Sequence, residues 1–205
     1  MTFYRRNLPH WHPEGKAIFL TWRLAGSLPE SCRGGRTGSH RAETKHTGKS
    51  AGATEDGAAG EWDEKFHRLD AELDRAASGP VWLRSPEIAC YVEGAILRGS
   101  EFGHYVLHAY VVMPNHVHML LRPRVPLRRI TGAIKGVSAR DANTVLRRTG
   151  LPFWQNESFD RWIRDDEEFQ RIRSYIELNP VAAGLAASPD QWPCSSANPA
   201  SRIIR

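Results

Sequence analysis

Two histidines separated by one residue, His116 and His118, have the spacing of a metal-ligand pair. They begin the run HVHMLLR, whose apolar residues favour a β-strand. Residues i and i+2 of a strand point to the same face, so the two imidazoles would stand side by side on an open face while Val117 and Met119 turn toward the helices. Imidazole binds divalent first-row metals, so the pair predicts a metal site, although ordinary surface histidines in a basic protein can show the same spacing.

A tyrosine and an asparagine, Tyr175 and Asn179, form a second pair with chemical potential. They are four residues apart at the end of a predicted helix, where positions i and i+4 share one face. The phenol could supply a nucleophilic oxygen, and the amide carbonyl could bind a metal. Taken singly, a core tyrosine and an Asn-Pro helix ending would explain each residue equally well.

The elements that must position these residues follow from hydrophobic periodicity and helix-end signals. In order, they are a strand over 17–24, helices over 62–77 and 85–97, strands over 105–113 and 116–122, a basic amphipathic helix over 126–148 and a helix over 165–178 that ends at Asn179-Pro180. This order favours an α+β fold in which helices cover one face of an antiparallel sheet. If the hairpin loop has an even number of residues, His108 faces away from the histidine pair and is not expected to bind the metal.

One segment interrupts this pattern. Residues 29–61 contain no Val, Ile, Leu, Met, Phe, Trp or Tyr and consist mainly of Gly, Ser, Thr, Ala and charged residues. Such a segment buries too little apolar surface to offset the entropy cost of ordering it. We therefore predict a single domain over 1–205 with a flexible low-complexity insertion at about 29–61.

Composition narrows the class of protein. The 205 residues carry a formal net charge of +5, and most of the cationic residues are arginine. This composition suits a polyanionic partner. No segment has the length and apolarity of a membrane span or a secretory signal, so we expect a cytoplasmic protein with no membrane partner. The three cysteines Cys32, Cys90 and Cys194 are far apart and fit neither a disulfide framework nor a C-x-x-C zinc motif.

Two blocks of sequence resemble a known family. YVVMPNHVHMLL, followed about sixty residues later by RSYIELNPVAAGL, resembles the single-tyrosine HUH transposases of the insertion-sequence type, and more closely the REP-associated tyrosine transposases. The opening YRRNLPHWHPEGKAIFLTWRL and the ending WPCSSA are also similar to that group. The resemblance covers nearly the whole chain except 29–61.

This resemblance implies a fold, a site and a reaction. The fold would be a ferredoxin-like antiparallel sheet of the HUH endonuclease type, with a tyrosine helix across it. His116 and His118 would bind Mg²⁺ or Mn²⁺, Asn179 would be a third, weaker ligand, and Tyr175 would be the nucleophile. The protein would be a bacterial DNA transposase that acts near the nucleoid, cleaving and rejoining single-stranded hairpin DNA through a 5′-phosphotyrosine, as a monomer or a homodimer.

The basic surface would recognise the DNA. Arginines with an aromatic neighbour suit single strands and hairpin loops through phosphate contacts and base stacking. The expected DNA-binding residues are Tyr4, Arg5, Arg6, Arg128, Arg129, Lys135 and Arg140.

Two other functions compete with this one. A domesticated protein could bind hairpin DNA without cleaving it, although a pure binder has no reason to keep His116, His118, Tyr175 and Asn179 together. A metallohydrolase could use the histidine pair, but it would need acidic ligands nearby, and residues 105–125 contain no Asp or Glu.

Overall fold

The computed structural model describes residues 2–5, 9–12, 15–28 and 66–202, the first two ranges by their backbone. A four-stranded antiparallel sheet forms the centre, in the order β4 (Tyr105–Val112), β5 (His116–Pro123), β3 (Ile18–Arg23) and β6 (Phe159–Trp162). Helices follow β3 and β5, so the chain runs β-α-β-β-α-β through this sheet, which is the ferredoxin-like order. The predicted α+β fold class is confirmed.

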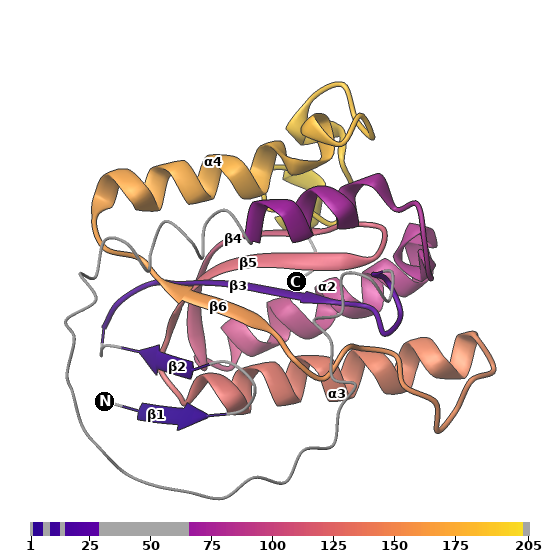
Figure 1. The fold of residues 1–205 in the computed structure, drawn as a ribbon, viewed down its shortest axis with the longest axis horizontal. Coiled ribbons are helices and arrows are strands. Elements are labelled where there is room, and N and C mark those ends of the chain that lie inside the picture. The colour runs from indigo at the N-terminus through magenta and orange to yellow at the C-terminus, as the bar shows by residue number, and fades with distance from the viewer. Residues whose placement is uncertain (1, 6–8, 13–14, 29–65, 203–205) are drawn as a thin grey trace, which may run out of the picture.

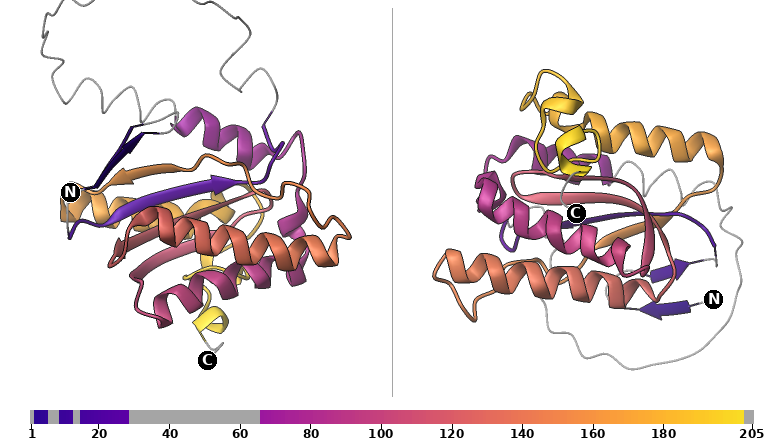
Figure 2. Two further views of the ribbon diagram at one scale, coloured as in Figure 1. Left: turned by 90° about the horizontal axis from the view of Figure 1, so that it is seen from below. Right: turned by 180° about the vertical axis from the view of Figure 1, so that it is seen from behind.

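Helices cover both faces of the sheet rather than one. α2 (Pro86–Glu101) and α3 (Leu127–Val145) pack together on one face, whereas the helix over 66–75 and α4 (Asp166–Ala182) lie over the other (Figures 1 and 2). The expectation of a one-faced covering is therefore wrong. The apolar stripes of the helices did not reveal which face each would cover, because periodicity specifies a buried side and not its partner.

The alternation along the central strands separates two cores. Val117, Met119 and Leu121 of β5 point into the core beneath α2 and α3, as predicted. Leu120 points into the opposite core, which α4 and the helix over 66–75 cover, and the period of two places His116 and His118 on that same side.

The hairpin differs from the simplest expectation in two details. Its loop holds the three residues 113–115, an odd number, and β4 carries a bulge between Leu107 and Ala109. The bulge leaves His108 without a directly opposed partner in β5. From Val112, opposite Val117, to Ala109, opposite Leu120, the register is the one that an even connection gives, so the bulge alone turns His108 to the other face.

Other elements extend beyond the prediction. α4 continues through Pro180 to Ala182 instead of ending at Asn179. Strand β6 was not predicted and completes the sheet beside β3. A separate hairpin pairs β1 (Thr2–Arg5) with β2 (Pro9–His12).

Some predictions are not tested by this fold. The segment 29–61 lies outside the described residues, and the single-domain organisation of 1–205 stays a prediction. Within the described ranges, no helix combines the length and the apolarity needed to cross a bilayer.

Candidate active site

The histidine pair lies side by side as the strand alternation predicts, but it is buried. The side chains of His116 and His118 are both 0% exposed, and their Nε2 atoms lie 3.0 Å apart. The open face expected from the sequence is in fact closed by the helix over 66–75 and by α4 (Figure 1).

Two neighbouring polar side chains hold the imidazoles from behind. The Nδ1 atom of His116 lies 2.7 Å from Oδ1 of Asn115, whose Nδ2 donates to the carbonyl of Leu73. Because this second bond fixes the orientation of the amide, Nδ1 of His116 must carry the proton, and the neutral ring leaves a lone pair on Nε2. The Nδ1 atom of His118 lies 2.7 Å from Oγ1 of Thr21, directly opposite on β3.

Two carboxylates from the helix over 66–75 approach the same point. Oδ1 of Asp70 lies 3.2 Å from Nε2 of His118 and 3.8 Å from Nε2 of His116. Oδ1 of Asp74 lies 3.7 Å from Nε2 of His116. The argument that the pair has no acid nearby is therefore wrong, because the acids come from a segment far from it in the chain.

These residues fit a divalent cation. The three ligand atoms of Asp70, His116 and His118 lie within 4.8 Å of one another, and all three residues are buried. Oδ1 of Asp70 and Oδ1 of Asp74 are buried without a hydrogen-bond partner. Two ligand atoms bound at about 2.1 Å and at right angles to each other would be about 3.0 Å apart, which matches the separation of the Nε2 atoms. A cation would satisfy every one of these atoms at once.

The electrostatic environment of the cluster favours a neutral ring on His116. Burial, together with the neighbouring His118, lowers the pKa of His116 to about 3, so its ring is neutral at physiological pH. Burial alone would raise the pKa of Asp70, but the adjacent His118 and His116 outweigh it and hold that pKa below the ordinary value. Burial and the charge of Asp70 raise the pKa of Asp74 to about 7.

Tyr175 lies on α4 above this cluster. Its ring centroid is 5.6 Å from that of His118, and it packs against Phe19 and Phe66 at 6.1 and 6.3 Å. The half-buried tyrosine also lines a pocket of about 250 Å³, together with Arg161 and Arg171. The structure thus brings Tyr175 and the histidine pair together from separate elements.

The start of α4 is anchored so that the tyrosine is held in place. Asp165 caps the helix by accepting a hydrogen bond from the backbone N–H of Glu168. The Glu168 carboxylate, nearly buried, accepts bonds from the N–H of Arg164 and from the guanidinium of Arg161 on β6. These contacts tie the first turn of the tyrosine helix to the edge of the sheet.

Asn179 and His108 differ in their relation to the cluster. Oδ1 of Asn179 is buried without a partner, which leaves it available as a ligand, and its predicted role stays a prediction.

His108 contacts Phe169 on α4, with ring centroids 5.0 Å apart, so it points to the same side of the sheet as the histidine pair. The predicted facing of His108 is wrong because of the bulge, but His108 does not belong to the described ligand group.

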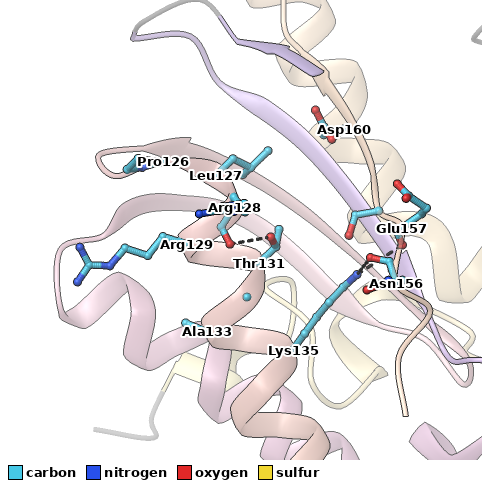
Figure 3. A pocket seen from close by; sticks show the side chains of 12 residues that line it. Pro126, Leu127, Arg128, Arg129, Thr131, Ala133, Lys135, Asn156, Glu157 and Asp160 are labelled. Carbon is cyan, nitrogen blue, oxygen red and sulfur yellow. Dashed lines mark hydrogen bonds between the residues drawn. The ribbon is translucent and has the colours of Figure 1, made fainter. Parts of the chain in front are cut away.

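The predicted DNA-binding residues lie partly on the surface of α3. Arg128 and Arg129 line a pocket of about 900 Å³ between the start of α3 and residues 156–160 (Figure 3). Lys135 lines it too, but its ammonium donates to the carbonyls of Gln155, Asn156 and Glu157. This cation anchors the loop before β6, and its role as a DNA contact stays a prediction.

The remaining predicted contacts are of two kinds. Arg140 is exposed on α3 and pairs with its neighbour Asp141. Tyr4 and Arg5 lie in β1, with side chains outside the described part, and Arg6 is not described.

Sequence reasoning missed Asp70, Asp74, Thr21 and Asn115. A signal for Asp70 was present: it lies four residues after Phe66 and three before Leu73, on the apolar stripe of its helix, where an acid needs a partner.

The structure has a ferredoxin-like sheet with an H-x-H pair on a central strand, beneath a helix that carries a tyrosine, which is the arrangement that the resemblance to the HUH transposases implies. Residues 89–179 match the family described as "Transposase IS200 like", a stretch that includes His116, His118 and Tyr175. This part of the chain is therefore similar to the IS200-like transposases.

Two solved structures are similar to the chain, and the first of them shares its fold. A REP-associated tyrosine transposase bound to a REP hairpin shares the fold, with 17% sequence identity, a TM-score of 0.54, and coverage of 95% of this chain and 82% of that chain. A candidate transposase from Deinococcus radiodurans R1 is 16% identical over 85% of this chain and 98% of that chain, with a TM-score of 0.35. No curated protein matches the sequence.

Proposed function

We propose that this protein cleaves and rejoins single-stranded hairpin DNA through a covalent 5′-phosphotyrosine on Tyr175. The observation that carries the proposal is the position of Tyr175, whose ring centroid lies 5.6 Å from that of His118 in a buried His/Asp cluster. The hairpin substrate is supported by the shared fold with a transposase bound to a REP hairpin.

His116, His118 and Asp70 would hold a divalent cation, with Asn179 as a further candidate ligand. Mg²⁺ and Mn²⁺ suit this mixture of imidazole and oxygen donors. When bound, the cation would supply positive charge to the non-bridging oxygens of a phosphodiester, whose own charge otherwise repels a nucleophile.

The residues of the chain would orient the ligands and the nucleophile and bind the phosphate. Asn115 and Thr21 keep Nδ1 of each imidazole occupied, so that both Nε2 atoms would be left to bind the cation. The aromatic cluster holds the ring of Tyr175 beside the site. Arg171, which is exposed and lines the same pocket as Tyr175, offers a guanidinium to the phosphate.

The reaction exchanges one ester for another. The Tyr175 oxygen loses its proton and forms a bond to phosphorus, while the bond between phosphorus and the 3′-oxygen breaks and that oxygen leaves as a 3′-hydroxyl. The energy of the original ester remains in the phosphotyrosine, so a second 3′-hydroxyl can reverse the step and join strands without ATP.

A covalent-adduct assay tests this proposal. Hairpin DNA labelled on the 3′ side of the expected cut is incubated with the protein and Mn²⁺, and the denatured product is digested with trypsin. We expect label on the peptide 174–202, which contains Tyr175. A product with a free 5′-phosphate and no protein attached would instead indicate hydrolysis by the metal site, and binding without cleavage would indicate a domesticated DNA-binding protein.

A further inference from the structure

A second group of metal-ligating side chains lies on the opposite face of the sheet from the histidine pair. Cys90 and Glu93 of α2 meet Cys194, and their ligand atoms lie within 4.8 Å of one another. Glu93 is 2% exposed and Cys194 5%, whereas Cys90 is exposed. Cys194 belongs to the core beneath α2 and α3, so this cluster is separate from the proposed DNA-cleavage site.

Three elements bring these residues together. Cys90 and Glu93 are three residues apart on α2 and therefore share one side of the helix. Cys194 lies in the segment after α4, which pairs with the edge strand β4: Val112 N–H donates to the carbonyl of Cys194, and Ser196 N–H to that of Tyr110. Cys194 has a φ of 55°, which is uncommon for a residue other than glycine, so these contacts hold it in a specific conformation.

The buried carboxylate is also held in a fixed direction. The hydroxyl of Tyr110 donates to Oε1 of Glu93 at 2.8 Å. Hydrogen bonds of this kind to a ligating carboxylate orient it toward the metal in known sites. Tyr110 therefore links the carboxylate of α2 to the same strand that positions Cys194.

We propose that Cys90, Glu93 and Cys194 form a zinc site. Zinc binds thiolate at about 2.3 Å and carboxylate at about 2.0–2.2 Å, so its ligand atoms are at most about 4.5 Å apart and tetrahedral pairs are closer, a spacing that small side-chain movements reach from this cluster. Two thiolates favour Zn²⁺ over Mg²⁺ or Mn²⁺, which prefer oxygen. The fourth position would be open to solvent beside the exposed Cys90.

Such a site would join the segment after α4 to α2. Because the segment follows the tyrosine helix and pairs with β4, the ion would stabilise the edge of the sheet away from the histidine pair. The bound state would gain stability by mass action, so the melting temperature should rise with Zn²⁺ concentration.

Cobalt substitution tests the proposal on the full, reduced chain. Co²⁺ bound to cysteine thiolates gives a near-ultraviolet charge-transfer band that imidazole and carboxylate ligands do not give. We expect one equivalent of Co²⁺ to produce this band and Zn²⁺ to displace it. Cys90→Ser and Cys194→Ser should each weaken the metal binding that the band reports by at least about tenfold, because each removes a first-sphere ligand.

Three controls make the outcome decisive. Cys32→Ser should leave the band unchanged, and so should His116→Ala with His118→Ala, which removes the other cluster. In the wild-type protein, Zn²⁺ should slow alkylation of Cys90 and Cys194 but not of Cys32, a measurement that does not depend on any variant folding. Absence of the band and of this protection would overturn the proposal, as would a Cys90–Cys194 disulfide in a protein that binds no metal after reduction.

Discussion

The side chain of Asn115 joins His116 to the helix that carries Asp70. Its Oδ1 lies 2.7 Å from Nδ1 of His116, and its Nδ2 donates to the carbonyl of Leu73 at 2.9 Å. One buried amide therefore orients the imidazole of His116 on β5 and also holds the helix over 66–75 that supplies the Asp70 carboxylate. The His/Asp cluster depends on this connection, because its side chains come from two segments that are far apart in the chain.

The variant Asn115→Ala should damage both functions of this amide. We expect Mn²⁺ affinity, measured by calorimetry, to fall by about 10- to 100-fold, which is typical for loss of a residue that orients a ligand. Amide hydrogen exchange of residues 66–75 should also accelerate. The matched variant Thr21→Val removes the bond to His118 only, so it should lower the affinity without changing the exchange. Unchanged exchange in Asn115→Ala would contradict the role assigned to the Leu73 bond.

The third ligand can be identified by comparing Asp70→Asn with Asn179→Ala. Asp70 lies 3.2 Å from Nε2 of His118, so we expect its replacement to weaken Mn²⁺ binding more than replacement of Asn179, a neutral donor for which water can substitute. His116→Ala should abolish cleavage of hairpin DNA. A larger loss of affinity in Asn179→Ala than in Asp70→Asn would indicate that Asn179, on the same helix as Tyr175, is the third ligand.

The variant Tyr175→Phe should separate binding from cleavage. It keeps the ring that packs against Phe19 and Phe66 but lacks the attacking oxygen. Hairpin DNA should bind with the same affinity and salt dependence, since phosphate contacts come from cations. No covalent adduct should form, and Mn²⁺ affinity should be nearly unchanged. Undiminished adduct formation by this variant would mean that another residue is the nucleophile.

Asp74 predicts an unusual pH dependence of stability in the metal-free protein. Its pKa is raised to about 7 by burial and by Asp70, against 3.8 in the unfolded chain. Between these values the folded protein binds the extra proton, so stability rises as the pH falls from 7 toward 3.8. Asp74→Asn should stabilise the protein at pH ~8 by about 1–2 kcal/mol, allowing for solvent screening of this partly exposed group, and have little effect near pH ~4.

Thermal unfolding in the presence of a chelator measures this effect as a change in melting temperature of several degrees. The exposed Asp190 offers a matched control for the loss of one carboxylate, and the effect of Asp74→Asn is measured relative to that of Asp190→Asn at each pH. An equal effect of Asp74→Asn at both pH values would show that its carboxyl does not titrate near neutrality.

Arg129 and Lys135 of α3 should differ in what their replacement changes, DNA affinity in one case and stability in the other. Arg129→Ala should lower hairpin affinity and reduce the slope of log affinity against log salt by about 1, as expected for one phosphate contact. Lys135→Gln should instead lower the melting temperature, because the ammonium holds the carbonyls of residues 155–157. A salt slope that changes for Lys135→Gln and not for Arg129→Ala would reverse these assignments.

Much of the fold followed from the sequence because local patterns dictate it. The alternation of β5 placed Val117 and Met119 opposite the histidine pair, as the two cores confirm. The same rule misplaced His108, because it requires an unbroken strand, and the bulge after Leu107 reverses the facing. A bulge depends on the neighbouring strand, which a local pattern does not contain.

The sequence alone was sufficient for the residues within one element, namely the H-x-H pair on a strand and the tyrosine on a helix, because period and spacing determine which side chains share a face. Contacts between distant segments were decided only by tertiary structure. Asp70 reaches His118, and Cys194 reaches Cys90, through packing of the helix over 66–75, α2 and the C-terminal segment on the two faces of the sheet. Which helix covers which face of the sheet depends on how well their side-chain surfaces pack together. This packing cannot be inferred from the spacing of residues along the chain.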